Sequence, residues 1–85
     1  MKEFVYIIKD PVGIHARPAG LLVKKAQEFQ SCITVRKGEK SADMKKLFAV
    51  MGLSAKCGDE IVVIASGEDE NLAVSALEEF IREKF

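Results

Sequence analysis

Ile61-Val62-Val63-Ile64-Ala65 is a run of five apolar residues in the second half of the chain. A strand with one face in water alternates polar and apolar side chains, whereas a strand that is apolar at every position is typical of the inside of a sheet. The run therefore predicts an inner strand with a neighbour on each side. The rest of the chain must supply those neighbours and a cover for the sheet.

Three other segments are candidate strands. Residues 4–8 form a short apolar run, and residues 32–36 alternate around three consecutive β-branched residues. Residues 37–40 read Lys-Gly-Glu-Lys, which indicates a hairpin turn that leads into a short polar strand at 41–43. The sequence thus predicts a sheet of four strands.

Three segments have helical patterns. The helix expected after residue 15 has an apolar stripe made of Ala19, Leu22, Val23 and Ala26. Residues 45–53 are too few for a stable isolated helix and must be held by tertiary packing. Acidic residues after Gly67 favour the start of a last helix, and its expected stripe consists of Ala73, Ala76, Leu77 and Phe80. Strands and helices together predict an α+β two-layer sandwich with helices on one face of the sheet.

Chain length and hydropathy limit the number of domains and the kinds of segment that the chain can contain. Eighty-five residues suffice for a single domain, residues 1–85, with one core and no deep cofactor cavity, so we expect no cofactor. No stretch reaches the roughly 20 apolar residues of a transmembrane helix. The first residues also lack the long apolar segment of a signal peptide. We therefore expect a cytoplasmic protein that does not insert into membranes.

The two cysteines, Cys32 and Cys57, belong to no Cys-x-x-Cys pair and to no set of metal ligands. In a cytosolic protein we expect both to be reduced packing residues, although a single disulfide between them is the alternative. With one histidine and no paired cysteine motif, we expect no metal site.

The one histidine lies in the run Gly13-Ile14-His15-Ala16-Arg17-Pro18-Ala19. Apolar residues follow at helical spacing, so this run leads into the first turn of a helix. Proline is tolerated in that turn because the missing N–H would have no partner there. The remaining N–H groups are unpaired and lie at the positive end of the helix, which favours an anion near His15.

Imidazole in this place can act as a neutral nucleophile near pH 7 and hold a phosphoryl group. We expect His15 to accept such a group, with its oxygens bound by the guanidinium of Arg17 and by the backbone N–H groups near Ala16. The alternative is an ordinary helix-capping histidine beside a solvated arginine. A cation in the first turn of a helix is unfavourable by about 0.3–1 kcal/mol, so stability alone does not explain Arg17.

The same run resembles the active-site signature of HPr, the histidine-containing phosphocarrier of the bacterial sugar phosphotransferase system. The resemblance extends over the whole chain. Residues 47–53 (Leu-Phe-Ala-Val-Met-Gly-Leu) resemble the family's short second helix, and residues 65–70 (Ala-Ser-Gly-Glu-Asp-Glu) resemble the approach to its last helix. The resemblance implies an open-faced sandwich in which a four-stranded antiparallel sheet, in the order 1-4-2-3, is covered on one face by three helices.

The resemblance also implies a function. His15 would take phosphate on Nδ1 from enzyme I, which obtains it from phosphoenolpyruvate, and would pass it to sugar-specific IIA proteins. Arg17 matches the family's phosphate-binding arginine. The chain would then be a stoichiometric carrier and not an enzyme, and we expect it to be a monomer.

A docking surface beside the histidine follows from the same resemblance. Periodicity alone places the apolar residues of 45–53 in the core, whereas in the family the corresponding side chains contact partners. The expected members of the surface are Leu47, Phe48, Met51, Lys24, Lys45 and Lys46. Residues 17–56 carry nine basic and three acidic side chains, and residues 57–85 carry two basic and eight acidic ones. The basic region is either a solvated surface or one that speeds encounter with an acidic partner.

Lys46 departs from many Gram-positive relatives, which have a serine that a dedicated kinase phosphorylates. Lysine has no hydroxyl group and carries the opposite charge. We expect that the chain is neither a substrate of such a kinase at this position nor a corepressor that depends on it. Modification of Ser41 or Ser54 stays open.

Other classes of function have less support. An HPr-like regulatory module, whose binding depends on phosphorylation of His15, would need the same residues and is the main alternative. Nucleic-acid binding lacks aromatic-rich motifs, since Tyr6 is the single tyrosine and tryptophan is absent. Asp10 and Glu39 are isolated carboxylates that we interpret as solvated surface residues.

Overall fold

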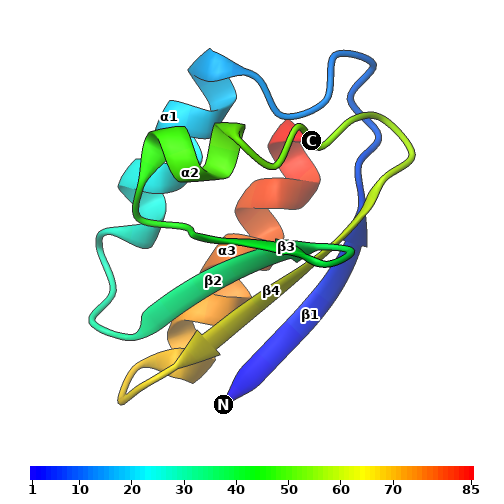
Figure 1. The fold of residues 1–85 in the computed structure, drawn as a ribbon. Helices are drawn as coiled ribbons and strands as arrows, with labels where there is room; N and C mark the ends of the chain where they lie inside the picture. Colours follow the sequence, from blue (N-terminus) through cyan, green and yellow to red (C-terminus); the bar gives the residue numbers. More distant parts are fainter.

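The computed structural model describes all 85 residues. The chain forms four strands and three helices, and Figure 1 shows how they are arranged. In order they are β1 (Lys2–Ile7), α1 (Ala16–Ala26), β2 (Cys32–Lys37), β3 (Lys40–Asp43), α2 (Leu47–Met51), β4 (Glu60–Ser66) and α3 (Glu70–Lys84). None of the helices combines the length and the apolar composition that a membrane crossing requires.

The four strands form one antiparallel sheet in the order β1-β4-β2-β3. β4 therefore lies between β1 and β2, as its apolar run predicts. Val63 illustrates the register, because it lies opposite Phe4 of β1 and opposite Val35 of β2, and all three side chains are buried. Both the fold class and the strand order that the resemblance implies are confirmed.

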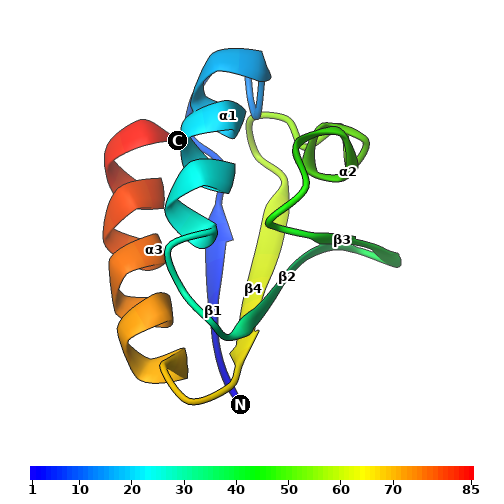
Figure 2. The ribbon, with the colours of Figure 1, turned by 90° about the vertical axis from the view of Figure 1, so that its left-hand side faces the viewer.

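Two long helices cover one face of the sheet. Figure 2 shows α1 and α3 side by side on that face, with α2 farther along, near β3. The four residues of the predicted α1 stripe are all buried, which confirms the helical spacing. In α3 the buried line is Ala73, Leu77 and Ile81. The predicted α3 stripe is confirmed at Ala73 and Leu77 and at Phe80, which is partly buried and packs against the core. It is corrected at Ile81, which is fully buried and was not expected, and at Ala76, which is only partly buried.

The short helix α2 is held by tertiary packing, as its length requires. Val50 at its end and Leu53 just beyond it are buried in the core. Leu47 is half-buried and packs against the core, so it is less exposed than its place in the expected docking surface implies. Phe48 points into solvent with 85% of its surface exposed. Packing thus uses one side of α2 and leaves the other side free.

The interpretation of the cysteines as packing residues is wrong. Cys32 and Cys57 are both exposed, and they form no disulfide. Cys32 lies at the start of β2 next to Ile33, which is buried. Because side chains alternate along a strand, Cys32 faces the side of the sheet without helices. Cys57 lies in the loop before β4, with its Sγ 3.8 Å from the carbonyl oxygen of Lys9.

The carboxylate of Asp69, before α3, joins that helix to the loop between α1 and β2. It accepts hydrogen bonds from the backbone N–H of Gln30 at 2.8 Å and of Ser31 at 2.9 Å, and also from the Ser31 hydroxyl. These donors, the hydroxyl first, lower the pKa of Asp69 below its ordinary value of 3.8. The charged form of the carboxylate therefore stabilises the fold.

We expect Asp69→Ala to lower the free energy of unfolding at neutral pH. A carboxyl group whose pKa is lowered by folding stabilises the protein above its ordinary pKa, and this contribution is lost as the pH falls through the folded value. The difference between wild type and Asp69→Ala should therefore shrink in acid. Urea unfolding from neutral pH to well below pH 3.8 measures it. Glu68→Ala, at an exposed neighbour without hydrogen bonds, is the control. A difference that stays constant over this range contradicts the assignment.

Candidate functional site

The loop between β1 and α1, residues 8–15, is tied down at its start by backbone hydrogen bonds. The N–H of Ile8 donates to the carbonyl oxygen of Asp59 at 2.9 Å. The N–H groups of Lys9 and Asp10 both donate to the carbonyl oxygen of Phe85, at 2.6 and 2.7 Å. Two segments that are distant in sequence, the loop before β4 and the end of α3, thus fix this part of the loop.

The second half of the loop is held in the same way. Asp10 accepts two bonds, from the N–H of Val12 to its Oδ1 at 2.8 Å and from the N–H of Gly13 to its carbonyl oxygen at 2.9 Å. The N–H of Ile14 donates to the carbonyl oxygen of Ala55 at 3.0 Å. Proline at position 11 has no N–H. Every backbone donor from residue 8 to residue 14 therefore has an acceptor within the protein.

Gly13 is required by close contact with the loop that follows α2. Its φ of +80° lies in the left-handed region, which disfavours any residue with a Cβ. A Cβ at this position would lie 2.5 Å from the oxygen of Ala55 and 2.8 Å from the Cα of Lys56. Both are backbone atoms that cannot turn away. The glycine lets the two loops touch, and it fixes the chain two residues before His15.

The hydrogen-bond pattern changes at His15. The backbone N–H groups of His15, Ala16 and Arg17 donate to no atom of the protein. His15 is the N-cap of α1 in an extended conformation (φ −123°, ψ 175°), and its carbonyl oxygen accepts the N–H of Ala19 at 2.9 Å. The prediction that the histidine immediately precedes the first helical turn is confirmed. Three consecutive free donors lie at the positive end of α1, where an anion is favoured.

The two charged or titratable side chains of this site have no partner in the protein. The imidazole of His15 is half-buried and makes no hydrogen bond, and it does not cap the helix. The guanidinium of Arg17 is exposed, with no carboxylate within salt-bridge distance. An unbonded nucleophilic ring, free amide donors and an unpaired cation can together bind a phosphoryl group attached to the ring.

An apolar side chain and free cations lie on the two helices that follow. Phe48 of α2 is exposed, while Leu47 and Met51 are half-buried against the core. Figure 1 shows α2 beside α1. Leu21 on α1 is 46% exposed. It was not among the expected surface residues, although its position outside the apolar stripe of α1 indicates that it does not face the core.

The three lysines of the expected docking surface differ in exposure and in whether their ammonium groups are hydrogen-bonded within the protein. Lys24 and Lys46 are exposed, and their ammonium groups have no partner in the protein. Lys45 is half-buried, and its Nζ donates to the carbonyl oxygen of Phe29 at 2.7 Å. The carbonyl oxygen of Lys45 also accepts the side-chain amide of Gln27 at 3.0 Å. Lys45 therefore joins α2 to the end of α1.

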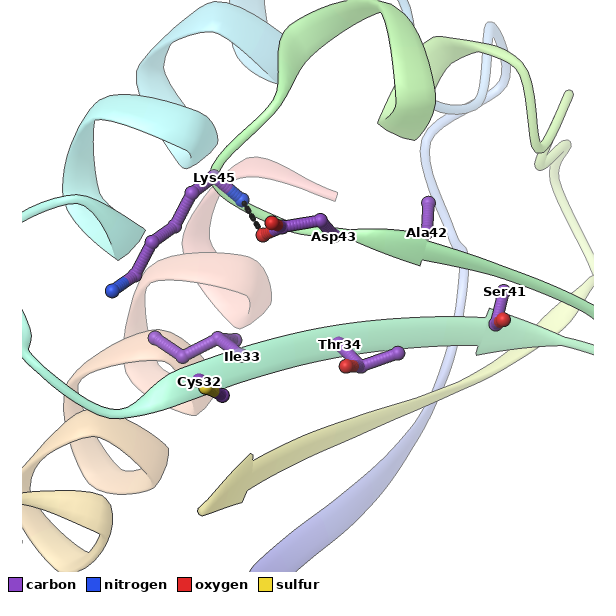
Figure 3. A pocket seen from close by; sticks show the side chains of 7 residues that line it. All are labelled: Cys32, Ile33, Thr34, Ser41, Ala42, Asp43 and Lys45. Carbon is purple, nitrogen blue, oxygen red and sulfur yellow. Dashed lines mark hydrogen bonds between the residues drawn. The ribbon is translucent and has the colours of Figure 1, made fainter. Parts of the chain in front are cut away.

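A shallow groove along β2 and β3 does not include the histidine. Figure 3 shows its lining, which combines polar and apolar side chains and in which the backbone N–H of Lys45 donates to the carboxylate of Asp43. The seven lining residues are Cys32, Ile33, Thr34, Ser41, Ala42, Asp43 and Lys45. None belongs to the loop of residues 8–15, so the groove and the histidine site are separate.

Comparison with known proteins points to one family. A sequence model of the family described as "PTS HPr component phosphorylation site" matches residues 2–83. The phosphocarrier protein HPr of Lysinibacillus sphaericus is 46% identical over 83 residues, which cover 98% of this chain and 94% of that protein. A crystal structure of HPr from Thermoanaerobacter tengcongensis has a TM-score of 0.94 and 40% identity, covering 100% of this chain and 96% of that one.

A second crystal structure, described as an HPr dimer from Thermoanaerobacter tengcongensis, has a TM-score of 0.79 at 39% identity and covers 99% of this chain and 97% of that one. The matches to these relatives span nearly the full length of both chains. Members of the family are carriers of a phosphoryl group and not enzymes. The chain belongs to the HPr family, the phosphocarrier proteins of the phosphotransferase system.

Proposed function

We propose that this chain carries a phosphoryl group on His15, which it accepts from enzyme I and delivers to IIA proteins. The observation that carries the proposal is the set of three consecutive backbone N–H groups, at His15, Ala16 and Arg17, that have no acceptor while every donor of the preceding loop has one. Unpaired donors in the first turn of a helix favour an anion beside them. The phosphoryl oxygens would satisfy these donors.

The transfer itself exchanges one bond to phosphorus for another. The lone pair of a ring nitrogen of His15 attacks the phosphorus atom, and the bond from phosphorus to the donor group breaks with its electron pair left on the donor. Delivery to the acceptor runs the same exchange in the opposite sense. The protein would contribute position and charge stabilisation, with the guanidinium of Arg17 and the free N–H groups as donors to the group that moves. Charge-assisted hydrogen bonds of this kind contribute roughly 1.5–3 kcal/mol each.

A carrier must release what it binds. Interactions that strengthen in the transition state speed transfer, whereas tight binding of the phosphorylated state alone would trap the group. The site suits this requirement because its cation, Arg17, is exposed and is not fixed by a carboxylate. One exposed arginine and three backbone N–H groups would bind phosphate moderately.

The surface on α1 and α2 is the proposed docking site for both partners. Phe48 supplies an exposed apolar centre, and the half-buried Leu47 and Met51 extend it. Lys24 and Lys46 supply positive charges with no partner within the chain, while Lys45 contributes its charge from the position that Phe29 fixes. A small apolar centre with charges around it suits an interface that forms and dissociates quickly, of less than roughly 1,200 Å².

We also propose that Lys46 makes the chain unresponsive to a serine kinase at this position, because an amine cannot accept phosphate in the manner of a hydroxyl. Its exposed ammonium group instead favours an acidic partner surface.

The proposed setting is a monomer in the cytoplasm. Two exposed thiols without a disulfide fit a reducing compartment. The apolar core of 21 buried residues closes within one chain, which supports a monomer. The dimeric HPr structure of Thermoanaerobacter tengcongensis shows that a similar chain can also associate.

We expect wild type incubated with phosphoenolpyruvate and enzyme I to gain one acid-labile phosphate, measured by intact-mass analysis. His15→Ala should gain none, because no other residue in the chain is a histidine. Circular dichroism of both proteins controls for folding. A phosphorylated His15→Ala variant, or a wild type that stays unmodified with active enzyme I, contradicts the proposal.

We expect Lys46→Glu to slow phosphorylation by enzyme I about threefold or more at low salt, since a charge at the rim of an interface acts mainly on encounter. The difference should narrow at high salt, because screening weakens interactions between exposed charges. Lys40→Glu is the matched control, as Lys40 is equally exposed but lies on the β2–β3 hairpin. Equal rates for wild type and Lys46→Glu at low salt would remove Lys46 from the docking surface.

A further inference from the structure

We propose that Asp10 is a positioning residue for phosphoryl transfer, because its two oxygen acceptors fold residues 10–13 into the turn that sets the direction of the chain at His15. The inference rests on the proposed function of His15. Asp10 does not touch the phosphoryl group in this account. It acts through the backbone of the loop, and this differs from the solvated surface residue that the sequence indicates.

The turn is built from two bonds to one residue. Oδ1 of Asp10 accepts the N–H of Val12 at 2.8 Å, and the carbonyl oxygen of Asp10 accepts the N–H of Gly13 at 2.9 Å. Aspartate commonly forms such turns, and a proline at the next position restricts φ without losing a needed donor. Pro11 occupies that position. The carboxylate thus gives the N–H of Val12 an acceptor, and without it this N–H would have none within the protein.

Packing does not hold this part of the loop. Val12 is 67% exposed, and Pro11 is exposed as well, so no buried side chain anchors residues 11 and 12. The fixed points lie on either side. Phe85, a residue that is 4% exposed, accepts the N–H groups of Lys9 and Asp10 at its backbone oxygen. Gly13 lies against Ala55. Asp10 is the hydrogen-bonding link between these two fixed points.

The turn at Asp10 affects His15 because Gly13 and Ile14, the two residues that precede His15, have little conformational freedom. Gly13 needs a φ of +80° to fit against Ala55, and the N–H of Ile14 must meet the oxygen of the same residue. If the hydrogen bonds to Asp10 are lost, residues 10–12 no longer hold Gly13 in the conformation that fits against Ala55. His15 and the free donors after it would then sample other directions. Misplacement of a reacting group by about 1 Å can slow a reaction on the order of a hundredfold.

The chain uses the same turn a second time. Oδ1 of Asp43 accepts the N–H of Lys45 at 2.9 Å, and the carbonyl oxygen of Asp43 accepts the N–H of Lys46 at 3.0 Å, immediately before α2. Figure 3 shows the bond to the side chain. In both places an aspartate turns the chain from a strand toward a helix. The second example supports a structural origin for the turn at Asp10, independent of any bound anion.

The acceptor oxygen, and not the negative charge, is the feature that the account requires. A carboxylate near a phosphoryl group would if anything repel it. Asparagine keeps an oxygen acceptor in the same place without the charge, and alanine removes it. We therefore expect Asp10→Asn to transfer phosphate at nearly the wild-type rate and Asp10→Ala to be slower by roughly tenfold or more.

The experiment measures the rate of His15 phosphorylation by enzyme I in four proteins: wild type, Asp10→Ala, Asp10→Asn and Asp69→Ala. Asp69→Ala is the matched control, because it also removes a carboxylate that accepts backbone N–H groups. Asp69 directly precedes α3, and Figure 1 shows the start of α3 at the opposite end of the molecule from the loop before α1. It should lose stability and keep its rate. A slow Asp69→Ala, or an Asp10→Asn as slow as Asp10→Ala, overturns the proposal.

Amide chemical shifts of the unphosphorylated proteins provide a second readout that needs no phosphate. We expect Asp10→Ala to move the resonances of residues 12–17, and Asp10→Asn and Asp69→Ala to leave them nearly in place. If Asp10→Ala leaves the resonances of His15, Ala16 and Arg17 unmoved, or moves them without slowing transfer, the positioning role is refuted. If wild type accepts no phosphate, the proposed function fails, and the shifts alone then decide whether Asp10 orients the loop.

Discussion

The contact between two backbones, Gly13 against Ala55, is the constraint on which the histidine site depends. It exists because position 13 has no side chain and because the N–H of Ile14 reaches the oxygen of Ala55 at 3.0 Å. The loop before α1 and the loop after α2 are thereby held together. His15 follows two residues after Gly13, so its position is fixed by the contact with the loop between α2 and β4. Precise placement is what phosphoryl transfer asks of a protein.

The hydrogen bonds of the loop before α1 show which of its backbone N–H groups are free for a ligand. Buried or structured backbone donors are nearly always satisfied within a protein. The loop obeys this rule up to Ile14 and departs from it at His15, Ala16 and Arg17. Two carboxylates of the acidic half support the fold: Asp69 accepts hydrogen bonds from three donors, and Asp59 pairs with Lys37 at 3.5 Å. Arg17, in the first turn of α1, has no carboxylate partner, so its positive charge stays available to an anion at the start of the helix.

Local patterns in the sequence predicted the elements well, since β4 and the α1 stripe depend on spacing along one strand or helix. The strand order came from the resemblance to HPr. The residues that support the site could not be predicted, because Phe85 and Ala55 act through carbonyl oxygens that every residue has, across large separations in sequence. The same holds for Lys45, whose bond to Phe29 depends on the packing of α2 against α1. Asp10 carried a weak signal, as an aspartate before a proline favours a turn.

The central claim is that the free N–H groups of residues 15–17 receive the phosphoryl oxygens. Amide proton shifts compared between the phosphorylated and the unphosphorylated chain test it most directly. The account predicts large downfield shifts for the N–H protons of His15, Ala16 and Arg17 and small ones for residues 8–14, whose N–H groups are already bonded within the protein. Shifts spread evenly over the loop, or largest outside residues 15–17, would contradict it.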